Sequence, residues 1–363
     1  MNGNKSGIQR KITRPVRVGG LILGGGNPIR IQSMTNAPSS DKEATLAQAL
    51  ALKEAGCELV RLAVNSTEAV KSAAYLAENA GMPIVADIHF DYKLAIEAVN
   101  AGVSKIRINP GNIGSPDRIK KLVAVCLDKK VPIRIGINSG SLEKNLLAKY
   151  GGPTAEALAE SAILSAETLE GFGFGDIVLS VKSSDVLTMI KANRVLSEKC
   201  VYPLHLGVTE TGTKEKGSIK SAIGIGSLLA DGIGDTLRVS LSDNVVEEVK
   251  AAKNILSALK IRSGINLISC PTCGRTEIDL IGIASRLQAE IDKIKTDEAI
   301  DVALMGCIVN GPGEAKEADV GAAGAGKDAV IFRHGEIIRK ISEEEILPEL
   351  LKEINSIIKE RKQ

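Results

Sequence analysis

Short apolar runs rich in β-branched residues recur along the first two thirds of the chain. They lie at 29–34, 59–64, 83–89, 105–110, 132–138, 177–183, 204–210 and 236–242. Between successive runs, apolar positions follow a helical spacing, with Ser, Thr or Asp at the starts and Gly at the ends. Strand and helix alternating eight times predicts an α/β fold, a (β/α)8 TIM-type barrel. An open, doubly wound sheet is the alternative, but the even spacing favours closure.

The segments on either side of this alternation predict different structures. Residues 13–28 predict a β-hairpin with a Gly-Gly turn. After a helix at about 244–258 the alternation stops, and the remainder predicts a smaller α+β unit. Its expected elements are a strand in the INLIS segment, a helix near 276–295, a strand at 301–306, a hairpin at 329–341 and a final helix from about 342. The segment 322–328 is expected to be a surface turn. The predicted domains are therefore 1–260, a barrel that binds the substrate, and 261–363, an α+β cluster domain.

Composition limits the classes of function. A hydrophobic content of 44% and a charged content of 25% are ordinary for a globular protein. The net charge of +2 exerts no long-range pull on polyanions, and 2% aromatic residues provide no stacking platform for nucleic acid. The chain shows neither a signal-peptide pattern nor an apolar run of about 18 residues. Six cysteines in 363 residues indicate a reducing compartment rather than a disulfide framework. We expect a cytoplasmic protein that binds neither nucleic acid nor membranes.

Three cysteines lie in two motifs near the C-terminal end. Cys270 and Cys273 form a CPTC motif, and Cys307 precedes the turn-rich loop that ends at Glu314. Such a loop can fold back and aim the carboxylate at the centre that the cysteines hold. Three thiolates and one oxygen ligand suit an iron–sulfur cluster with one loosely held iron. Structural zinc is the alternative, but zinc sites usually pair two knuckles at shorter spacing, and the second motif here has one cysteine.

Polar and cationic residues gather at the carboxyl ends of the predicted strands, where barrel enzymes bind their substrates. They are Arg61, Arg107, Arg134, Asn138, Lys182, His205, Thr209, Arg238 and Ser240. Five of the eight strands bring a cation there, and Asp87 and Glu210 are the obvious local partners. This surplus predicts an anionic ligand, and the planar fork of arginine favours phosphate or diphosphate. An internally satisfied ion-pair network is the alternative.

Glu210 is the candidate acid or base of this site. A carboxylate among arginines and a bound ligand can transfer a proton to or from the reacting group. The alternative is a structural ion pair between Glu210 and Arg238.

Several motifs of both predicted domains resemble one family. They are QSMTN at 32–36, RINPGN at 107–112, IRIGINSGSLE at 133–143, SVKSSD at 180–185, HLGVTETG at 205–212, GIGDTLRVSLS at 232–242, SCPTCGRTEIDL and MGCIVNGPGEAKEADVG. The chain resembles the bacterial 4-hydroxy-3-methylbut-2-enyl diphosphate synthases of the non-mevalonate isoprenoid pathway over nearly its full length. One departure is Thr211, where many members carry Ala.

The resemblance implies a reductive ring opening of 2-C-methyl-D-erythritol 2,4-cyclodiphosphate. It implies a [4Fe-4S] cluster held by Cys270, Cys273, Cys307 and Glu314, with electrons from a flavodoxin or ferredoxin. It also implies a head-to-tail homodimer in which each cluster domain caps the partner's barrel. The chain itself favours that arrangement, because the helix after the eighth strand returns to the face opposite the barrel mouth.

Overall fold

A computed structural model describes residues 7–296, 298–308 and 315–362 of the protein. The chain divides into two compact units, residues 6–259 and residues 260–363. Each unit has its own sheet and its own hydrophobic core. None of the helices in the described ranges is long and apolar enough to cross a membrane.

The first unit is a barrel of eight parallel strands. In chain order they are β3 (Arg30–Met34), β4 (Leu59–Ala63), β5 (Ile84–Asp87), β6 (Lys105–Ile108), β7 (Ile133–Asn138), β8 (Ile177–Lys182), β9 (His205–Leu206) and β10 (Thr236–Leu237). Their order in the sheet is β8-β7-β6-β5-β4-β3-β10-β9, and a bridge between Leu179 and Leu204 joins the two end strands. The predicted (β/α)8 barrel is confirmed, although β9 and β10 are shorter than the apolar runs that predicted them.

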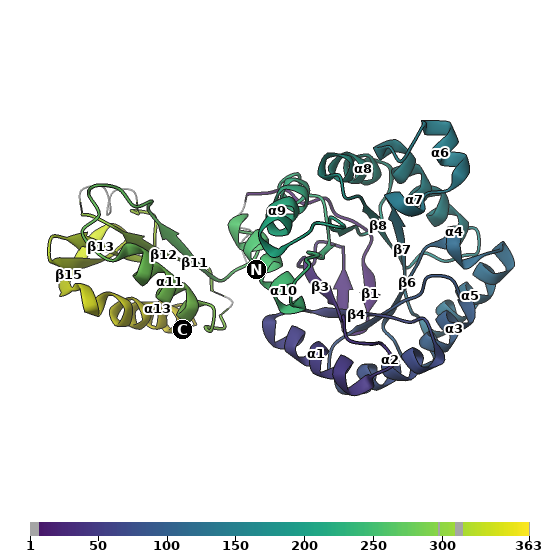
Figure 1. Ribbon diagram of the computed structural model, residues 1–363, viewed down its shortest axis with the longest axis horizontal. Coiled ribbons are helices and arrows are strands. Elements are labelled where there is room, and N and C mark those ends of the chain that lie inside the picture. Colours follow the sequence, from purple (N-terminus) through teal and green to yellow (C-terminus); the bar gives the residue numbers. More distant parts are fainter. Residues whose placement is uncertain (1–6, 297, 309–314, 363) are drawn as a thin grey trace. The chain divides into compact units, whose positions relative to one another are not determined.

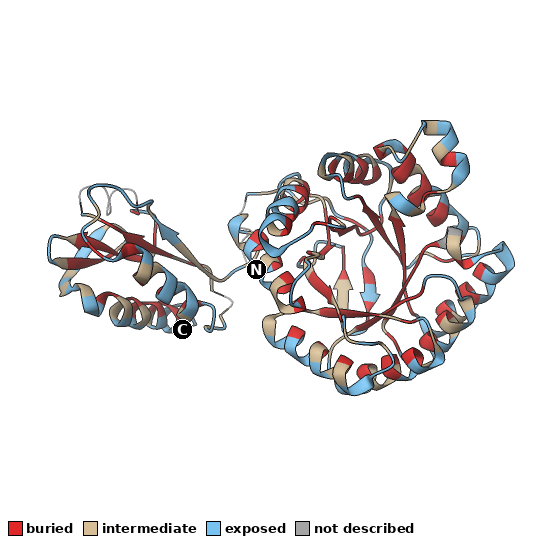
Figure 2. Cartoon of the chain, in the orientation of Figure 1, coloured by how far each residue is buried: buried red, intermediate tan, exposed pale blue. Residues whose placement is uncertain are grey.

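Helices surround the barrel strands, as Figure 1 shows. They are α1 (Lys42–Ala55), α2 (Thr67–Asn79), α3 (Tyr92–Asn100), α4 (Pro110–Ile113), α5 (Pro116–Lys129), α6 (Lys144–Tyr150), α7 (Ala155–Glu170), α8 (Val186–Lys199), α9 (Lys214–Ala230) and α10 (Val245–Ala258). Asp41 and Ser66 cap α1 and α2 by accepting from backbone N–H groups, and Gly56 ends α1 in the left-handed region. The helices bury one face against the strands and expose the other (Figure 2).

The predicted hairpin closes one end of the barrel. It consists of β1 (Val16–Val18) and β2 (Leu21–Leu23), which pair antiparallel. Its apolar side chains form one buried cluster with residues from the amino-terminal ends of three barrel strands: Val16, Val18, Leu23, Leu59, Val85 and Val178. The amino-terminal face of the barrel therefore has an apolar floor, and polar groups in the barrel interior lie between this floor and the carboxyl ends of the strands.

The second unit is a five-stranded sheet with helices on one face. Its strands are β11 (Ile265–Ser269), β12 (Ile300–Met305), β13 (Val320–Ala325), β14 (Asp328–Arg333) and β15 (Glu336–Ser342), in that spatial order. The first three strands are parallel and the last two pairings are antiparallel. Helices α11 (Leu280–Ile291) and α13 (Ile346–Lys362) pack on the sheet through a shared apolar core. The predicted helices, the β14–β15 hairpin and its turn at His334 and Gly335 are confirmed.

The prediction of a surface turn at 322–328 is wrong. Most of this segment belongs to β13, whose residues 320–324 are buried. Small residues are required there because a side chain at Gly321 would collide with the ring of Phe332, and one at Gly324 would lie 2.6 Å from the carbonyl oxygen of Gly306. The turn itself is confined to the two residues that separate β13 from β14.

Candidate active site

Two arginines of the barrel interior share one carboxylate. Arg107 Nη1 donates to Asp87 Oδ1 at 3.1 Å, and Arg61 Nε lies 3.6 Å from Asp87 Oδ2. His89 Nε2 lies 3.5 Å from the same Oδ2 atom. Burial acts to raise the pKa of the Asp87 carboxyl, but Arg61, His89 and Arg107 outweigh it and hold that pKa well below its usual range. Asp87 therefore stays ionised and fixes both guanidinium groups.

Arg238 pairs with a carboxylate that the sequence analysis missed. Its Nε and Nη2 atoms donate to Glu248 of α10 at 3.2 and 3.1 Å, and Glu248 also accepts from Ser33 Oγ and from the backbone N–H of Leu241. Among the described residues Arg238 forms its ion pair with Glu248, and none is formed with Glu210. The sequence could have identified Glu248, because it lies on the apolar face of α10 beside the buried Val245 and Val249.

Lys182 and Arg134 are buried cations without a carboxylate partner among the described residues. Lys182 is 7% exposed and Arg134 is 1% exposed, and Arg134 Nε and Nη1 have no hydrogen-bond partner within the described part of the chain. Burial, followed by repulsion from Arg61 and Arg238, lowers the pKa of Lys182 well below its ordinary value. An anion in the barrel interior would relieve this repulsion, so the arrangement favours an anionic ligand over an internally satisfied network.

Two strand glycines make room for these cations. A side chain at Gly136 would collide with the Arg107 guanidinium, and a Cβ at Gly207 would lie 2.6 Å from Lys182 Nζ. Both glycines lie inside barrel strands or their direct extensions, where glycine otherwise weakens a strand. The sequences IRIGIN and HLGVTE thus keep space open around the positive charges.

Replacing Gly136 by Ala is expected to weaken binding of inorganic diphosphate about tenfold, since the new methyl group displaces Arg107 from Asp87. Isothermal titration calorimetry measures the change. Gly140→Ala is the matched control, because a Cβ at Gly140 meets no atom within 4 Å. Unchanged affinity in Gly136→Ala would contradict a binding role for the Arg107 guanidinium.

The remaining barrel residues lie around these charges. His205 is fully buried, its Nδ1 pairs with Thr236 Oγ1, and burial followed by the nearby cations lowers the pKa of its imidazole well below the usual value. The Asn138 amide, with its oxygen toward the donors, accepts from Arg107 Nη2 at 3.3 Å. Thr209 and Ser240 lie in the segments that follow β9 and β10, beyond the carboxyl ends of these strands. The neutral His205 offers hydrogen bonds rather than charge.

Glu210 stands at the barrel mouth in a constrained backbone conformation. Its φ angle is +54°, in the left-handed region that non-glycine residues adopt at a cost of about 1 kcal/mol or more. Its side chain is exposed, and it makes no ion pair with any residue that the structure describes. The backbone therefore holds the carboxylate at the opening of the barrel, free to meet a ligand.

The cysteine motifs meet at one edge of the second sheet. Cys270 follows β11 and Cys307 follows β12, and these parallel neighbours pair Ser269 with Leu304, so both motifs begin at the same sheet edge. The backbone N–H of Gly306 donates to Cys270 Sγ at 3.2 Å. The Arg275 backbone N–H, followed by weaker effects of its guanidinium, lowers the pKa of the Cys273 thiol. All six cysteines of the chain are free thiols.

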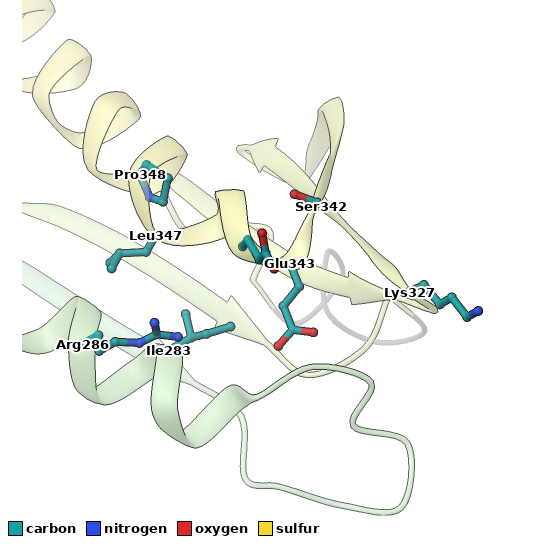
Figure 3. Close-up of a pocket in the computed structure, with 8 residues that line it drawn as sticks. Ile283, Arg286, Lys327, Ser342, Glu343, Leu347 and Pro348 are labelled. Atoms are coloured by element: carbon teal, nitrogen blue, oxygen red, sulfur yellow. The ribbon is translucent and has the colours of Figure 1, made fainter.

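The predicted fourth ligand, Glu314, is not tested by the structure. Glu314 lies outside the described residues, and within them no three Cys, His, Asp or Glu side chains gather closely enough to hold a single metal ion. A surface pocket of the second unit lies between α11 and the start of α13 (Figure 3). It is lined by Ile283, Arg286, Lys327, Ser342, Glu343, Glu344, Leu347 and Pro348. Since no cysteine borders it, this pocket is separate from the cysteine motifs.

Fold and site together define a two-unit class of protein, a (β/α)8 barrel with buried cations in its interior followed by an α+β unit with three motif cysteines. Comparison with known proteins specifies it further. The GcpE TIM-barrel domain matches residues 13–253, and the GcpE protein C-terminal domain matches residues 266–356. The chain belongs to the GcpE family.

Two similar proteins share a name. The 4-hydroxy-3-methylbut-2-en-1-yl diphosphate synthase (flavodoxin) of Ruminiclostridium cellulolyticum is 50% identical, over 96% of this chain and 99% of that protein. The protein of the same name from Clostridium perfringens is 54% identical, over 96% of this chain and 100% of that protein. Among solved structures, dihydropteroate synthase from Xanthomonas albilineans has a TM-score of 0.47 and 16% identity, and the match covers 67% of this chain and 98% of that one.

Proposed function

We propose that the protein converts 2-C-methyl-D-erythritol 2,4-cyclodiphosphate to (E)-4-hydroxy-3-methylbut-2-enyl diphosphate. Two electrons and one proton are consumed. The ring C–O bond to the diphosphate and the neighbouring C–OH bond break, a C=C bond forms, and the hydroxyl leaves as water. The observation that carries the proposal is the set of buried, unpaired cations in the barrel of a chain half identical to synthases of this name.

The barrel residues bind and orient the diphosphate in this proposal. Arg134 and Lys182 supply positive charge that no described carboxylate neutralises, whereas Arg61, Arg107 and Arg238 are held in place by their carboxylates. Preorganised guanidinium groups pair with phosphate oxygens in a fork geometry. Asn138, His205, Thr209 and Ser240 add neutral hydrogen-bonding groups around the ligand. The binding energy of the diphosphate then holds the reacting carbons at the barrel mouth.

Glu210 is the proton donor in this mechanism. The departing hydroxyl needs one proton to leave as water, and a carboxyl at the barrel mouth can deliver it. The fixed backbone at Glu210 limits the directions in which its side chain reaches.

The cysteine motifs fit an iron–sulfur cluster. The lowered pKa of the Cys273 thiol favours the thiolate, which is the form that binds iron. The backbone N–H of Gly306, which donates to Cys270 Sγ, is a hydrogen-bond donor of the kind that surrounds cluster sulfur atoms. Cys270, Cys273, Cys307 and Glu314 would hold a [4Fe-4S] cluster. Bound there, the cluster would supply single electrons and a Lewis-acidic iron. The names of the relatives favour flavodoxin as the electron donor, with ferredoxin as the other candidate.

Anaerobic turnover tests the function directly. Purified, cluster-loaded protein is incubated with the cyclic diphosphate and a strong one-electron reductant, and the linear diphosphate is measured. The competing function is a barrel transferase with a structural zinc site that acts on a phosphorylated or pterin-like substrate. It predicts colourless protein, zinc by elemental analysis and no reductant-dependent product.

Arg238→Ala and Lys182→Ala are each expected to weaken diphosphate binding by about 1.5–3 kcal/mol, the contribution of a charge-assisted hydrogen bond. Both substituted residues belong to the barrel unit and not to the cysteine motifs, so the visible absorption of the loaded cluster should not change. Calorimetry and absorption spectra measure the two effects. Wild-type affinity in both variants would assign these cations a structural role.

A further inference from the structure

A second group of polar side chains is buried in the barrel interior, and the sequence analysis missed its central member. Lys105 begins β6, two residues before Arg107, so both side chains point to the same face of the strand. Lys105 is 0% exposed, and its Nζ atom has no hydrogen-bond partner in the part of the chain that the structure describes. A buried ammonium without a partner is unfavourable, so a compensating partner for Lys105 is expected.

Three other side chains with unpaired atoms come from other strands. Arg134 of β7 leaves Nε and Nη1 unpaired, and His205 of β9 leaves Nε2 unpaired. Gln32 of β3 leaves both amide atoms unpaired, and it faces the interior because its neighbour Ser33 points outward to Glu248 of α10. Each of the three is at most 1% exposed.

The unpaired atoms of these four side chains indicate which kind of ligand would satisfy them. Lys105, Arg134 and Gln32 present N–H donors. The carboxylate of Asp87 already serves Arg61 and Arg107. Each buried donor left unpaired destabilises the folded protein. A water molecule would satisfy some donors but not the repulsion between Lys105 and Arg134, which is second only to burial in its effect on Lys105. A compact anion with several oxygen atoms satisfies both requirements.

We propose that Lys105, Arg134, His205 and Gln32 form an inner subsite that binds one phosphoryl group of the substrate, with Lys105 as a direct ligand. The inference rests on the proposed function, because it assigns part of the same diphosphate to this subsite. Arg107 and Lys182 then contact the rest of the ligand nearer the barrel mouth.

Binding at this subsite is coupled to protonation of Lys105. The charged or titratable groups that face it are Arg61 of β4, Arg134 of β7 and His205 of β9. Burial, then Arg134 and Arg61, lowers the pKa of the Lys105 amine well below its ordinary value. A bound phosphoryl group opposes both effects and raises that pKa again. Ligand binding should therefore be accompanied by proton uptake.

Lys105→Met separates this role from a structural one. Met has similar length and no polar atom, so the ligand-free variant should be at least as heat-stable as the wild type. Inorganic diphosphate should nevertheless bind about 10- to 100-fold more weakly and raise the melting temperature less. Sulfate, which does not titrate near neutral pH, serves as the probe for proton uptake. Calorimetry in buffers of different ionisation enthalpy should show that the wild type takes up more protons on binding than the variant does.

Controls make each outcome decisive. Lys191→Met removes an exposed lysine of α8 and should change neither affinity nor proton uptake. Lys105→Gln replaces Lys105→Met if the latter does not fold. Wild-type affinity and proton uptake in the Lys105 variant overturn the inner subsite while leaving the proposed function intact. Failure of the wild type itself to bind diphosphate overturns both.

Discussion

Glu210→Gln is expected to lower kcat about 100-fold or more while binding of the cyclic diphosphate changes little. The substitution preserves shape and removes the proton that the departing hydroxyl requires. The exposed position of Glu210 and its lack of an ion pair among the described residues mean that the substitution breaks no structural contact. Steady-state kinetics under anaerobic conditions, with separate kcat and KM, measure the effect.

Glu215→Gln provides the matched control. Glu215 is an exposed carboxylate in the first turn of α9, a few residues further along the chain. Its replacement should leave kcat unchanged. If Glu210→Gln raises KM and leaves kcat intact, Glu210 positions the substrate and does not supply the proton.

A mixed dimer of two inactive chains is expected to regain activity. One chain carries Cys307→Ser and cannot assemble its cluster, and the other carries Glu210→Gln. If each barrel works with the cysteines of the partner subunit, one of the two sites in the mixed dimer combines an intact barrel with an intact cluster. Activity should then rise from near zero to about half that of the wild-type dimer.

We propose this shared site from the lengths of two segments of the chain. Helix α10 has 14 residues, about 21 Å of rise, and leads from the barrel mouth back toward the floor. Only residues 260–264 separate the barrel unit from β11, and five residues extend at most about 18 Å. Subunit exchange is verified by differently tagged chains. Confirmed exchange without recovered activity would mean that each chain uses its own cysteines.

The fold was largely predictable because burial repeats at regular intervals. Each barrel strand is covered on its outer face by a helix, so runs such as 59–64 and 177–183 are almost continuously apolar and easily found. The strands β9 and β10 were harder to delimit because their regular pairing with each other covers only two residues of each strand. Segment 322–328 was misassigned because small residues that fit around Phe332 look like a turn.

The charges of the site were only partly predictable. Arg107 and Arg134 lie within strands and follow from alternation, so the sequence pattern identified them. Lys105 lies at the first position of its strand, where a lysine usually marks the solvated end, and only the barrel geometry shows that it is buried. Glu248 lies ten residues after its partner Arg238, on a helix, and strand-by-strand inspection does not reach it.

The hairpin floor closes the amino-terminal end of the barrel and leaves the carboxyl ends of the strands as the route for polar molecules. Val16, Val18 and Leu23 fill its amino-terminal end with apolar side chains, which exclude a polar exit route on that side. Substrate, product and expelled water must therefore pass through the barrel mouth, one after the other. The linear diphosphate has to depart before the next cyclic diphosphate enters, and free product obstructs the same passage. Product inhibition should accordingly be competitive with substrate.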